Sequence, residues 1–165
     1  MPTIRVLQII GIVCRGGVES VVMNWYRNID REKVQFDFLI DGKEESLLDE
    51  EIRLLGGIPY KTERYSKNVF KTMYDTYRVV RDHKYDIVHC HMNTLSVFYL
   101  FAAWLAGARV RIVHSHSSAN PAEKKRYILK LLLRPFSAFF ATDLFACSTY
   151  AGEWMFGKKR MEKGQ

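Results

Sequence analysis

The chain has only three cysteines among 165 residues, and none of them forms a Cys-x-x-Cys pair. Cys14, Cys90 and Cys147 are also far apart in the sequence. An odd number of widely spaced cysteines argues against a disulfide framework and against a thiolate zinc site. We therefore expect a protein of a reducing compartment, which favours the cytoplasm.

Long apolar runs are missing as well. The first ten residues, MPTIRVLQII, contain too short an apolar stretch, and no cleavage pattern, for a signal peptide. The longest uncharged stretch, residues 92–108, is interrupted by polar residues and glycine, whereas a spanning helix needs about 20 mostly apolar residues. We expect a cytoplasmic protein, with peripheral attachment to the inner face of the plasma membrane as an option that the positive charge supports.

The common phosphate-binding and nucleic-acid-binding motifs do not occur. The loop with Gly11, Gly16 and Gly17 follows an apolar run and precedes a helical pattern, but its spacing is neither Gly-x-Gly-x-x-Gly nor that of a P-loop. Glycines at a helix start still allow close backbone approach and present free N–H groups to an anion. The loop is therefore a candidate ligand site, with a tight turn that binds nothing as the alternative.

Apolar β-type runs alternate with helical patterns along the chain. Strands are predicted at 4–10, 34–41, 58–63, 85–91, 110–116 and 143–148, and helices at 18–29, 47–55, 67–83, 94–106, 122–134 and 149–157. Such alternation is typical of an α/β, Rossmann-like, doubly wound and mainly parallel sheet with helices on both faces. Ligands of such sheets bind beyond the carboxyl ends of the strands.

Two predicted strands end in His-x-His, at His89 and His91 and at His114 and His116. Two such pairs on neighbouring strands could hold a metal ion. No Asp or Glu accompanies either pair, however, so hydrogen bonds to neighbouring backbone are the favoured role for His89 and His114. Polar loops follow the other two histidines, which makes both candidates for contact with a substrate.

The predicted helix at 122–134 combines an apolar stripe with basic residues. Its cationic side chains are candidates for contact with an anionic membrane: Lys124, Lys125, Arg126, Lys130 and Arg134. A solvated face over a buried apolar stripe explains the same pattern, and the net charge of +7 keeps both interpretations open. The basic residues are spread over many elements without a binding motif, so we expect no nucleic-acid partner.

Four segments, in this order, resemble one family. They are GGVE at 16–19, DIVHCH at 86–91, VHSH at 113–116 and FACSTYAGEWMFG at 145–157. Together they resemble the N-terminal half of a GT-B fold glycosyltransferase of family 4, the retaining family that includes capsule and exopolysaccharide enzymes. The resemblance implies two Rossmann-like domains across a cleft, a nucleotide-sugar donor, and a glycan or lipid-linked acceptor held mainly by the N-terminal domain.

The resemblance also implies roles for individual residues. His116 would reach the transferred sugar as the catalytic histidine. Gly16, Gly17 and Glu19 would lie on the donor side. The acceptor side would be lined by His91, Asn93, Thr94, Ser117 and Ser118. Family members generally need neither a metal nor a cofactor, so none is expected.

The family pattern continues into a donor domain that this sequence lacks. We therefore expect residues 1–157 to form the acceptor-side domain, residues 158–165 to begin a linker or a disordered tail, and the fragment alone to be inactive. Two other functions remain open at this stage. One is a GT-B-like nucleotide-sugar epimerase or hydrolase, which would need carboxylates in the cleft. The other is a non-catalytic binding module with metal at the histidine pairs.

Overall fold

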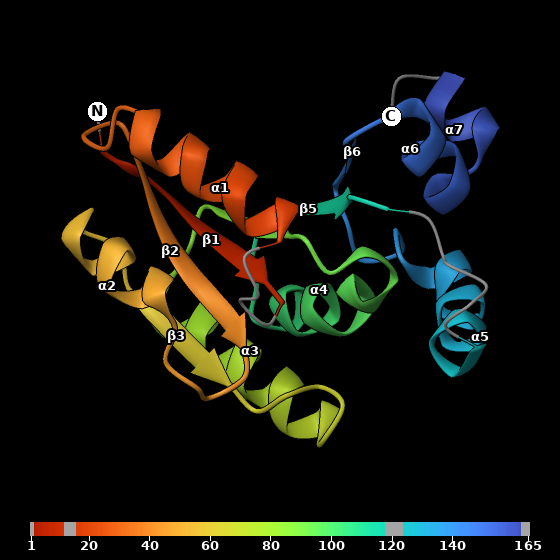
Figure 1. Ribbon diagram of the computed structural model, residues 1–165, viewed down its shortest axis with the longest axis horizontal. Coiled ribbons are helices and arrows are strands. Elements are labelled where there is room, and N and C mark those ends of the chain that lie inside the picture. The colour runs from red at the N-terminus through yellow and green to blue at the C-terminus, as the bar shows by residue number, and fades with distance from the viewer. Residues whose placement is uncertain (1, 12–15, 118–123, 163–165) are drawn as a thin grey trace.

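The computed structural model describes residues 2–11, 16–117 and 124–162. Its centre is one six-stranded sheet in which every pairing of strands is parallel, in the order β3-β2-β1-β4-β5-β6 (Figure 1). The strands are β1 (Ile4–Ile10), β2 (Val34–Asp41), β3 (Pro59–Thr62), β4 (Ile87–Cys90), β5 (Val110–Ser115) and β6 (Asp143–Ala146). The predicted fold class is confirmed, and the sheet is wholly parallel rather than mainly so.

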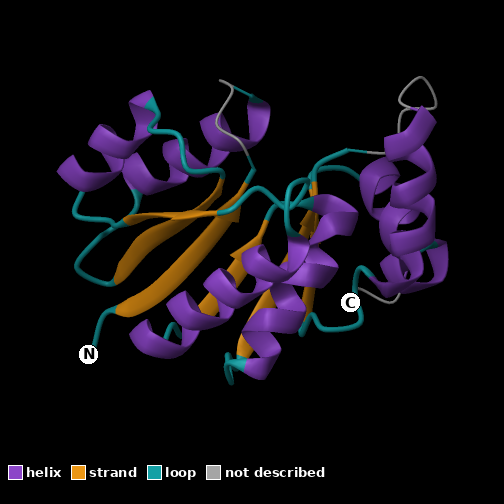
Figure 2. Cartoon of the chain, turned by 90° about the horizontal axis from the view of Figure 1, so that it is seen from below, coloured by secondary structure: helices purple, strands orange, loops and turns teal. Residues whose placement is uncertain are grey.

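Helices follow each strand and lie on both sides of the sheet (Figure 2). The α-helices of the described residues are α1 (Gly17–Asn28), α2 (Leu47–Leu54), α3 (Val69–His83), α4 (Ser96–Leu105), α5 (Lys124–Leu133), α6 (Thr149–Phe156) and α7 (Lys158–Glu162), with 3₁₀ turns η1 (Asn93–Leu95) and η2 (Arg134–Phe136). No helix among them is both long and apolar enough to span a bilayer.

The sheet has a separate apolar core on each face. On one face, α1 and α2 cover β1 and β2, and the buried side chains are Val6, Ile10, Val22, Met23, Tyr26, Phe36, Phe38, Ile40 and Ile52. On the other, α3, α4 and α6 cover the central strands with Leu7, Ile9, Leu39, Val80, Val88, Cys90, Leu100, Ala103, Val113 and Met155 among the buried residues. Alternate residues of β1 therefore enter opposite cores, as the pleat of a strand requires.

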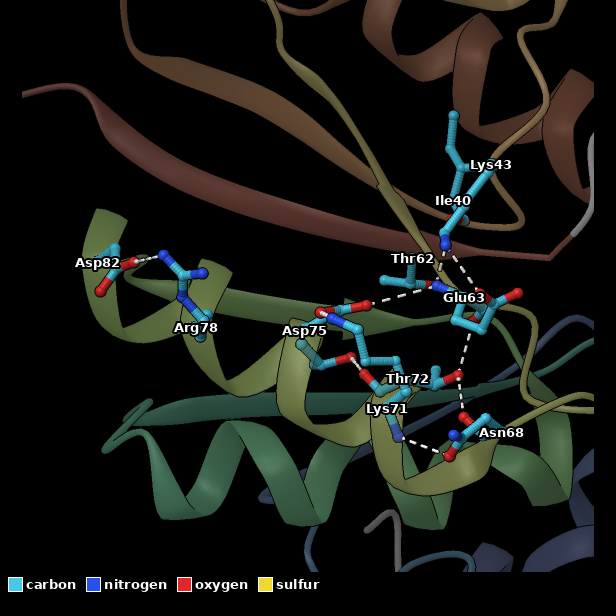
Figure 3. A network of polar contacts seen from close by, with 11 residues as sticks. Ile40, Lys43, Thr62, Glu63, Asn68, Lys71, Thr72, Asp75, Arg78 and Asp82 are labelled. Carbon is cyan, nitrogen blue, oxygen red and sulfur yellow. Dashed lines mark hydrogen bonds and ion pairs between the residues drawn. The ribbon is translucent and has the colours of Figure 1, made fainter.

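Helix α3 begins two residues later than predicted, and Asn68 caps it. The Asn68 side chain accepts a hydrogen bond from the backbone N–H of Lys71 at 3.0 Å. The same turn holds β3 to α3, because the Thr72 hydroxyl donates to the Glu63 carbonyl at 2.6 Å (Figure 3). Lys43 adds an ion pair to Glu63 at 2.8 Å, and this pair lowers the pKa of the Glu63 carboxyl.

The last described residues, where a linker or a disordered tail was expected to begin, are helical. Residues 158–162 form α7, and Met161 packs against Gly152 of α6, where a Cβ would lie 2.5 Å from the methionine methyl carbon. Helices α5, α6 and α7 gather towards the β6 end of the sheet (Figure 1). Glycine at position 152 therefore allows the last described helix to close onto the domain.

Strand order reverses between β1 and β4. The chain winds outwards from β1 through β2 to β3, then returns to the other side of β1 to form β4, β5 and β6. The loops after β1 and β4 consequently diverge at the carboxyl edge and leave a crevice between them, which is where doubly wound sheets bind ligands.

Candidate functional site

A cavity of about 330 Å³ lies at this reversal point, near the lower end of the size range of small-molecule sites. It is lined by Gly11, Gly16, Gly17, Val18, Glu19, Asp41, Tyr65, His91, Met92, Asn93, Thr94, Leu95 and Lys130. Six of the residues that the resemblance placed on the donor or acceptor side thus meet in one place: Gly16, Gly17, Glu19, His91, Asn93 and Thr94. A larger hollow, of about 600 Å³, lies where the strands begin and is lined by Ile4, Ile87 and Val110 among others.

The glycine loop forms one wall of the cavity at the start of α1. Gly16 is the N-cap residue and has no side chain that could cap the helix. The first turn therefore contributes its backbone N–H groups to this wall. A Cβ added to Gly16 would lie 2.6 Å from Oε2 of Glu19, whose side chain is largely buried. The carboxylate of Glu19 therefore folds back over the loop and makes this wall a mixture of backbone N–H groups and negative charge. Residues 12–15 of the loop lie outside the described residues.

Asn93 and Thr94 form the opposite wall, and their side chains differ in their hydrogen bonds. The side-chain oxygen of Asn93 accepts from the backbone N–H of His116 at 2.8 Å, so it joins the loop after β4 to the end of β5. The hydroxyl of Thr94 is buried and has no hydrogen-bond partner among the described residues. An unpaired buried hydroxyl costs stability, so Thr94 is the side chain of this wall best suited to bind a ligand.

The four histidines of the strand ends form one cluster. Nε2 of His89 lies 3.1 Å from Nδ1 of His114, and Nδ1 of His91 lies 2.8 Å from Nε2 of His116. Trp25 of α1 stacks over His89 and His114, with ring centroids 6.2 Å apart in both pairs. The sequence predicted that these strand ends would be neighbours, but it did not predict direct contact between the rings.

Burial governs the protonation of this cluster. It lowers the pKa of His89 to about 3 and of His114 to about 4, and the neighbouring imidazoles add to the effect. The pKa of His91 is lowered well below its ordinary value for the same reasons. Burial also lowers the pKa of His116, although the Glu19 carboxylate acts in the opposite direction. All four rings are therefore neutral at pH 7 and serve as hydrogen-bonding groups rather than as cations.

Three of these histidines approach the geometry of a metal site. The nearest ligand nitrogens of His89, His91 and His114 lie within 4.8 Å of one another. Both ring nitrogens of His91 already face partners, because Nε2 lies 2.8 Å from Oε1 of Gln8 and Nδ1 faces His116. A metal ion would have to replace these contacts, so the arrangement fits a hydrogen-bonded network better than a ligand set.

Asp41 and Gln8 are site residues that the sequence analysis missed. Asp41 is 2% exposed, lines the cavity from the end of β2, and accepts hydrogen bonds from Tyr65 N–H at 2.9 Å and from the Tyr99 hydroxyl at 3.0 Å. Burial raises its pKa, and these bonds act against the rise. Asp41 closes a strand as the histidines do, and Gln8 interrupts an apolar strand, so both carried a signal that could have been used.

Other predicted residues are not part of the cavity lining. His116 is half-buried, and its ring contacts that of His91, which does line the cavity. Ser117 also lies outside the lining. Ser117 is exposed after β5, and Ser118 lies outside the described residues.

The two described basic residues of the predicted helix, Lys130 in α5 and Arg134 in η2, have different surroundings. Lys130 lines the cavity, and the guanidinium of Arg134 lies 5.4 Å from the ring centre of Trp154. The side chains of Lys124, Lys125 and Arg126 lie outside the described part of the structure. The exposed side chains of this helix include apolar ones, namely Ile128, Leu129, Leu131 and Leu132.

Comparison with known proteins agrees with this fold. The family model described as Glycosyltransferase Family 4 matches residues 15–162. The Bacillus subtilis (strain 168) protein named "Putative glycosyltransferase EpsF" is 35% identical over 163 residues, which is 96% of this chain and 42% of that protein. The chain therefore spans less than half the length of this curated relative.

Solved structures share the fold at low identity. Anabaena Alr3699/HepE, crystallised in complex with UDP, superposes with a TM-score of 0.66 at 13% identity, over 92% of this chain and 40% of that one. A UDP-N-acetylglucosamine 2-epimerase superposes with a TM-score of 0.63 at 13% identity, over 99% and 46%. These likenesses show the fold, and the family match extends over most of the chain. The chain belongs to Glycosyltransferase Family 4.

Proposed function

We propose that this chain is the acceptor-side domain of a glycosyltransferase that transfers a hexosyl group from a nucleotide-sugar to a glycan or lipid-linked acceptor. The observation that carries the proposal is the cavity at the reversal of strand order, which joins the glycine loop to the polar wall after β4. Family membership and the name of the Bacillus relative, a putative glycosyltransferase, support the reaction class. The role in exopolysaccharide synthesis is proposed from the sequence resemblance alone.

The two walls suit the two substrates. Backbone N–H groups at the start of α1 favour a phosphate or sugar oxygen, while the carboxylate of Glu19 suits the hydroxyls of a sugar. Thr94 and Asp41 offer a hydroxyl and a carboxylate to an acceptor on the other side. Lys130 adds a positive charge to the same cavity.

In the proposed reaction the bond between the anomeric carbon and the phosphate oxygen breaks as the acceptor oxygen bonds to that carbon from the same face. The acceptor hydroxyl gives its proton to the departing phosphate oxygen, so configuration is retained and the nucleoside diphosphate leaves. A neutral His116 orients a sugar hydroxyl, and donors close to the departing diphosphate stabilise its charge. The proposed chemistry needs no metal and no other cofactor.

We further propose that the protein works in the cytoplasm, peripherally on the plasma membrane. Exposed apolar side chains of α5 and the following turns, Ile128, Leu132, Phe136 and Phe139, accompany a net charge of +7. Flotation with phosphatidylglycerol vesicles should recover the protein, and flotation with phosphatidylcholine vesicles should recover less. Equal recovery with both, or none with either, would remove the anionic membrane from the proposal.

One observation favours a second function, a nucleotide-sugar epimerase or hydrolase. The cavity contains two carboxylates, Glu19 and Asp41, which acid–base chemistry at a sugar would need. One experiment separates the two functions. The natural protein containing these residues is incubated with a panel of nucleotide-sugars, with and without glycan and lipid-linked acceptors, and the products are identified by mass spectrometry. Turnover that requires an acceptor supports the transferase, whereas turnover without one supports the alternative.

A further inference from the structure

Gln8 is a buried amide in the middle of an otherwise apolar strand. It is 1% exposed, and its neighbours in β1 enter the two apolar cores. A buried amide costs stability unless its polar atoms are hydrogen-bonded. Its partner lies 83 residues further along the chain, because Oε1 of Gln8 is 2.8 Å from Nε2 of His91.

The amide oxygen can only accept a hydrogen bond, and this fixes the direction of the contact. Nε2 of His91 must carry the proton and donate it to Gln8. A neutral imidazole has one protonated nitrogen, so Nδ1 of His91 is then bare. That bare nitrogen lies 2.8 Å from Nε2 of His116, which must therefore be protonated and act as the donor.

From these contacts we propose that Gln8 is a positioning residue for His116, acting through His91. In this series of hydrogen bonds His116 donates to His91 and His91 donates to Gln8, which leaves Nδ1 of His116 as a hydrogen-bond acceptor. The ligand group that such a nitrogen binds is a donor, such as a sugar hydroxyl, and not a fully ionised phosphate oxygen. This deepens the proposed function and, in its catalytic consequence, rests on it.

Two further contacts hold the series in place. The backbone N–H of His116 donates to the Asn93 side chain at 2.8 Å, which fixes the residue at the end of β5. The His91 ring lies beside that of His89, with centroids 4.1 Å apart, under the side chain of Trp25. A ring held on several sides keeps its orientation, so the amide of Gln8 can select its tautomer.

The test is a direct reading of tautomers in the unmodified chain. Long-range ¹H–¹⁵N correlation on ¹⁵N-labelled protein separates protonated from bare ring nitrogens, and single histidine substitutions assign the signals. The proposal expects protonated Nε2 and bare Nδ1 in both His91 and His116. Protonated Nδ1 in His116 would overturn it. In that case the amide nitrogen of Gln8, not its oxygen, would face His91, and every hydrogen bond of the series would run in the opposite direction. Stoichiometric zinc in the purified protein, lost in His91→Ala, would overturn it as well.

Variants at position 8 provide a second readout. Gln8→Met removes the acceptor at similar volume and should give His116 a mixture of tautomers, whereas Gln8→Glu keeps an acceptor and should preserve the wild-type tautomer. In transfer assays on the natural protein, Gln8→Met should lower kcat/KM about tenfold, which corresponds to the free energy of roughly one hydrogen bond. Gln8→Glu should keep most of the wild-type kcat/KM. Unchanged tautomers in Gln8→Met would contradict the proposal. Because the tautomer measurement needs no substrate, it stands even if the transfer reaction proves to be another one.

Discussion

The side-chain oxygen of Asn93 accepts a hydrogen bond from the backbone N–H of His116 at 2.8 Å, and so ties together the ends of two neighbouring parallel strands. Asn93 also has a positive φ of 50°, a conformation in which asparagine is tolerated better than most residues. The backbone conformation and the side-chain amide of Asn93 both suit this hydrogen bond to His116. The residue therefore holds the shape of the site, and its contact with the acceptor stays a prediction.

This role predicts a loss of stability when Asn93 is changed. Asn93→Ala removes the acceptor and leaves a strained backbone, so the free energy of unfolding should fall by about 1–2 kcal/mol. Asn93→Asp keeps an acceptor oxygen and should lose less. Urea unfolding followed by circular dichroism measures both variants, and equal stability of Asn93→Ala and the wild type would argue against the structural role.

Thr94 should behave in the opposite way. Its buried hydroxyl has no partner among the described residues, so Thr94→Val should leave the free energy of unfolding unchanged or raise it by about 1 kcal/mol. The same change should raise the KM for the acceptor about tenfold if the hydroxyl binds it. Thr94→Ser keeps the hydroxyl and serves as the control. A Thr94→Val variant with unchanged KM would remove this residue from the acceptor site.

Substitutions at two glycines should distinguish an effect on ligand binding from an effect on folding. A Cβ at Gly17 would meet nothing within 4 Å, so Gly17→Ala should be as stable as the wild type or more stable by up to about 1 kcal/mol. It should nevertheless raise the KM for the nucleotide-sugar if the backbone approaches the donor there. At Gly57 a Cβ would lie 2.5 Å from the Phe36 carbonyl oxygen, so Gly57→Ala should destabilise the fold, by roughly 1–3 kcal/mol. Similar stabilities for the two variants would contradict the packing described.

The histidine cluster predicts that stability falls as the pH is lowered below about 6.5. The pKa values of His89 and His114 are near 3 and 4 in the folded chain, so between these values and the ordinary one the unfolded chain binds more protons. Stability then rises with pH, by about 1.4 kcal/mol per pH unit for each such histidine, and is complete above the unfolded value. Urea unfolding between pH 7.5 and 5 should show this slope, and His114→Gln should reduce it. A slope that His114→Gln leaves unchanged would mean that His114 titrates normally.

Much of this fold followed from hydrophobic patterning. The alternation of strands and helices predicted the parallel sheet. The rule that such sheets bind ligands beyond the carboxyl ends of their strands predicted the edge at which the cavity lies. The details within the site depended on contacts between distant segments. No spacing in the sequence indicates that Gln8 would meet His91, or that the carboxylate of Glu19 would fold over Gly16, because side-chain directions are settled by packing. Considered with its helix alone, Lys130 is a candidate for membrane contact, and only the tertiary structure shows that it lines the cavity.

The most direct test of the account is the effect of His116→Ala on sugar transfer by the natural protein, compared with His83→Ala. His83 is a matched control because it lies on α3, where its ring packs beside Tyr60 of β3, and it is not part of the cavity lining. The account predicts that His116→Ala lowers kcat/KM at least tenfold, about the value of one hydrogen bond to a substrate, while His83→Ala stays within twofold. Equal activity of the two variants, with both folded by circular dichroism, would contradict the claim that the transferred sugar is held at the strand ends beside His116.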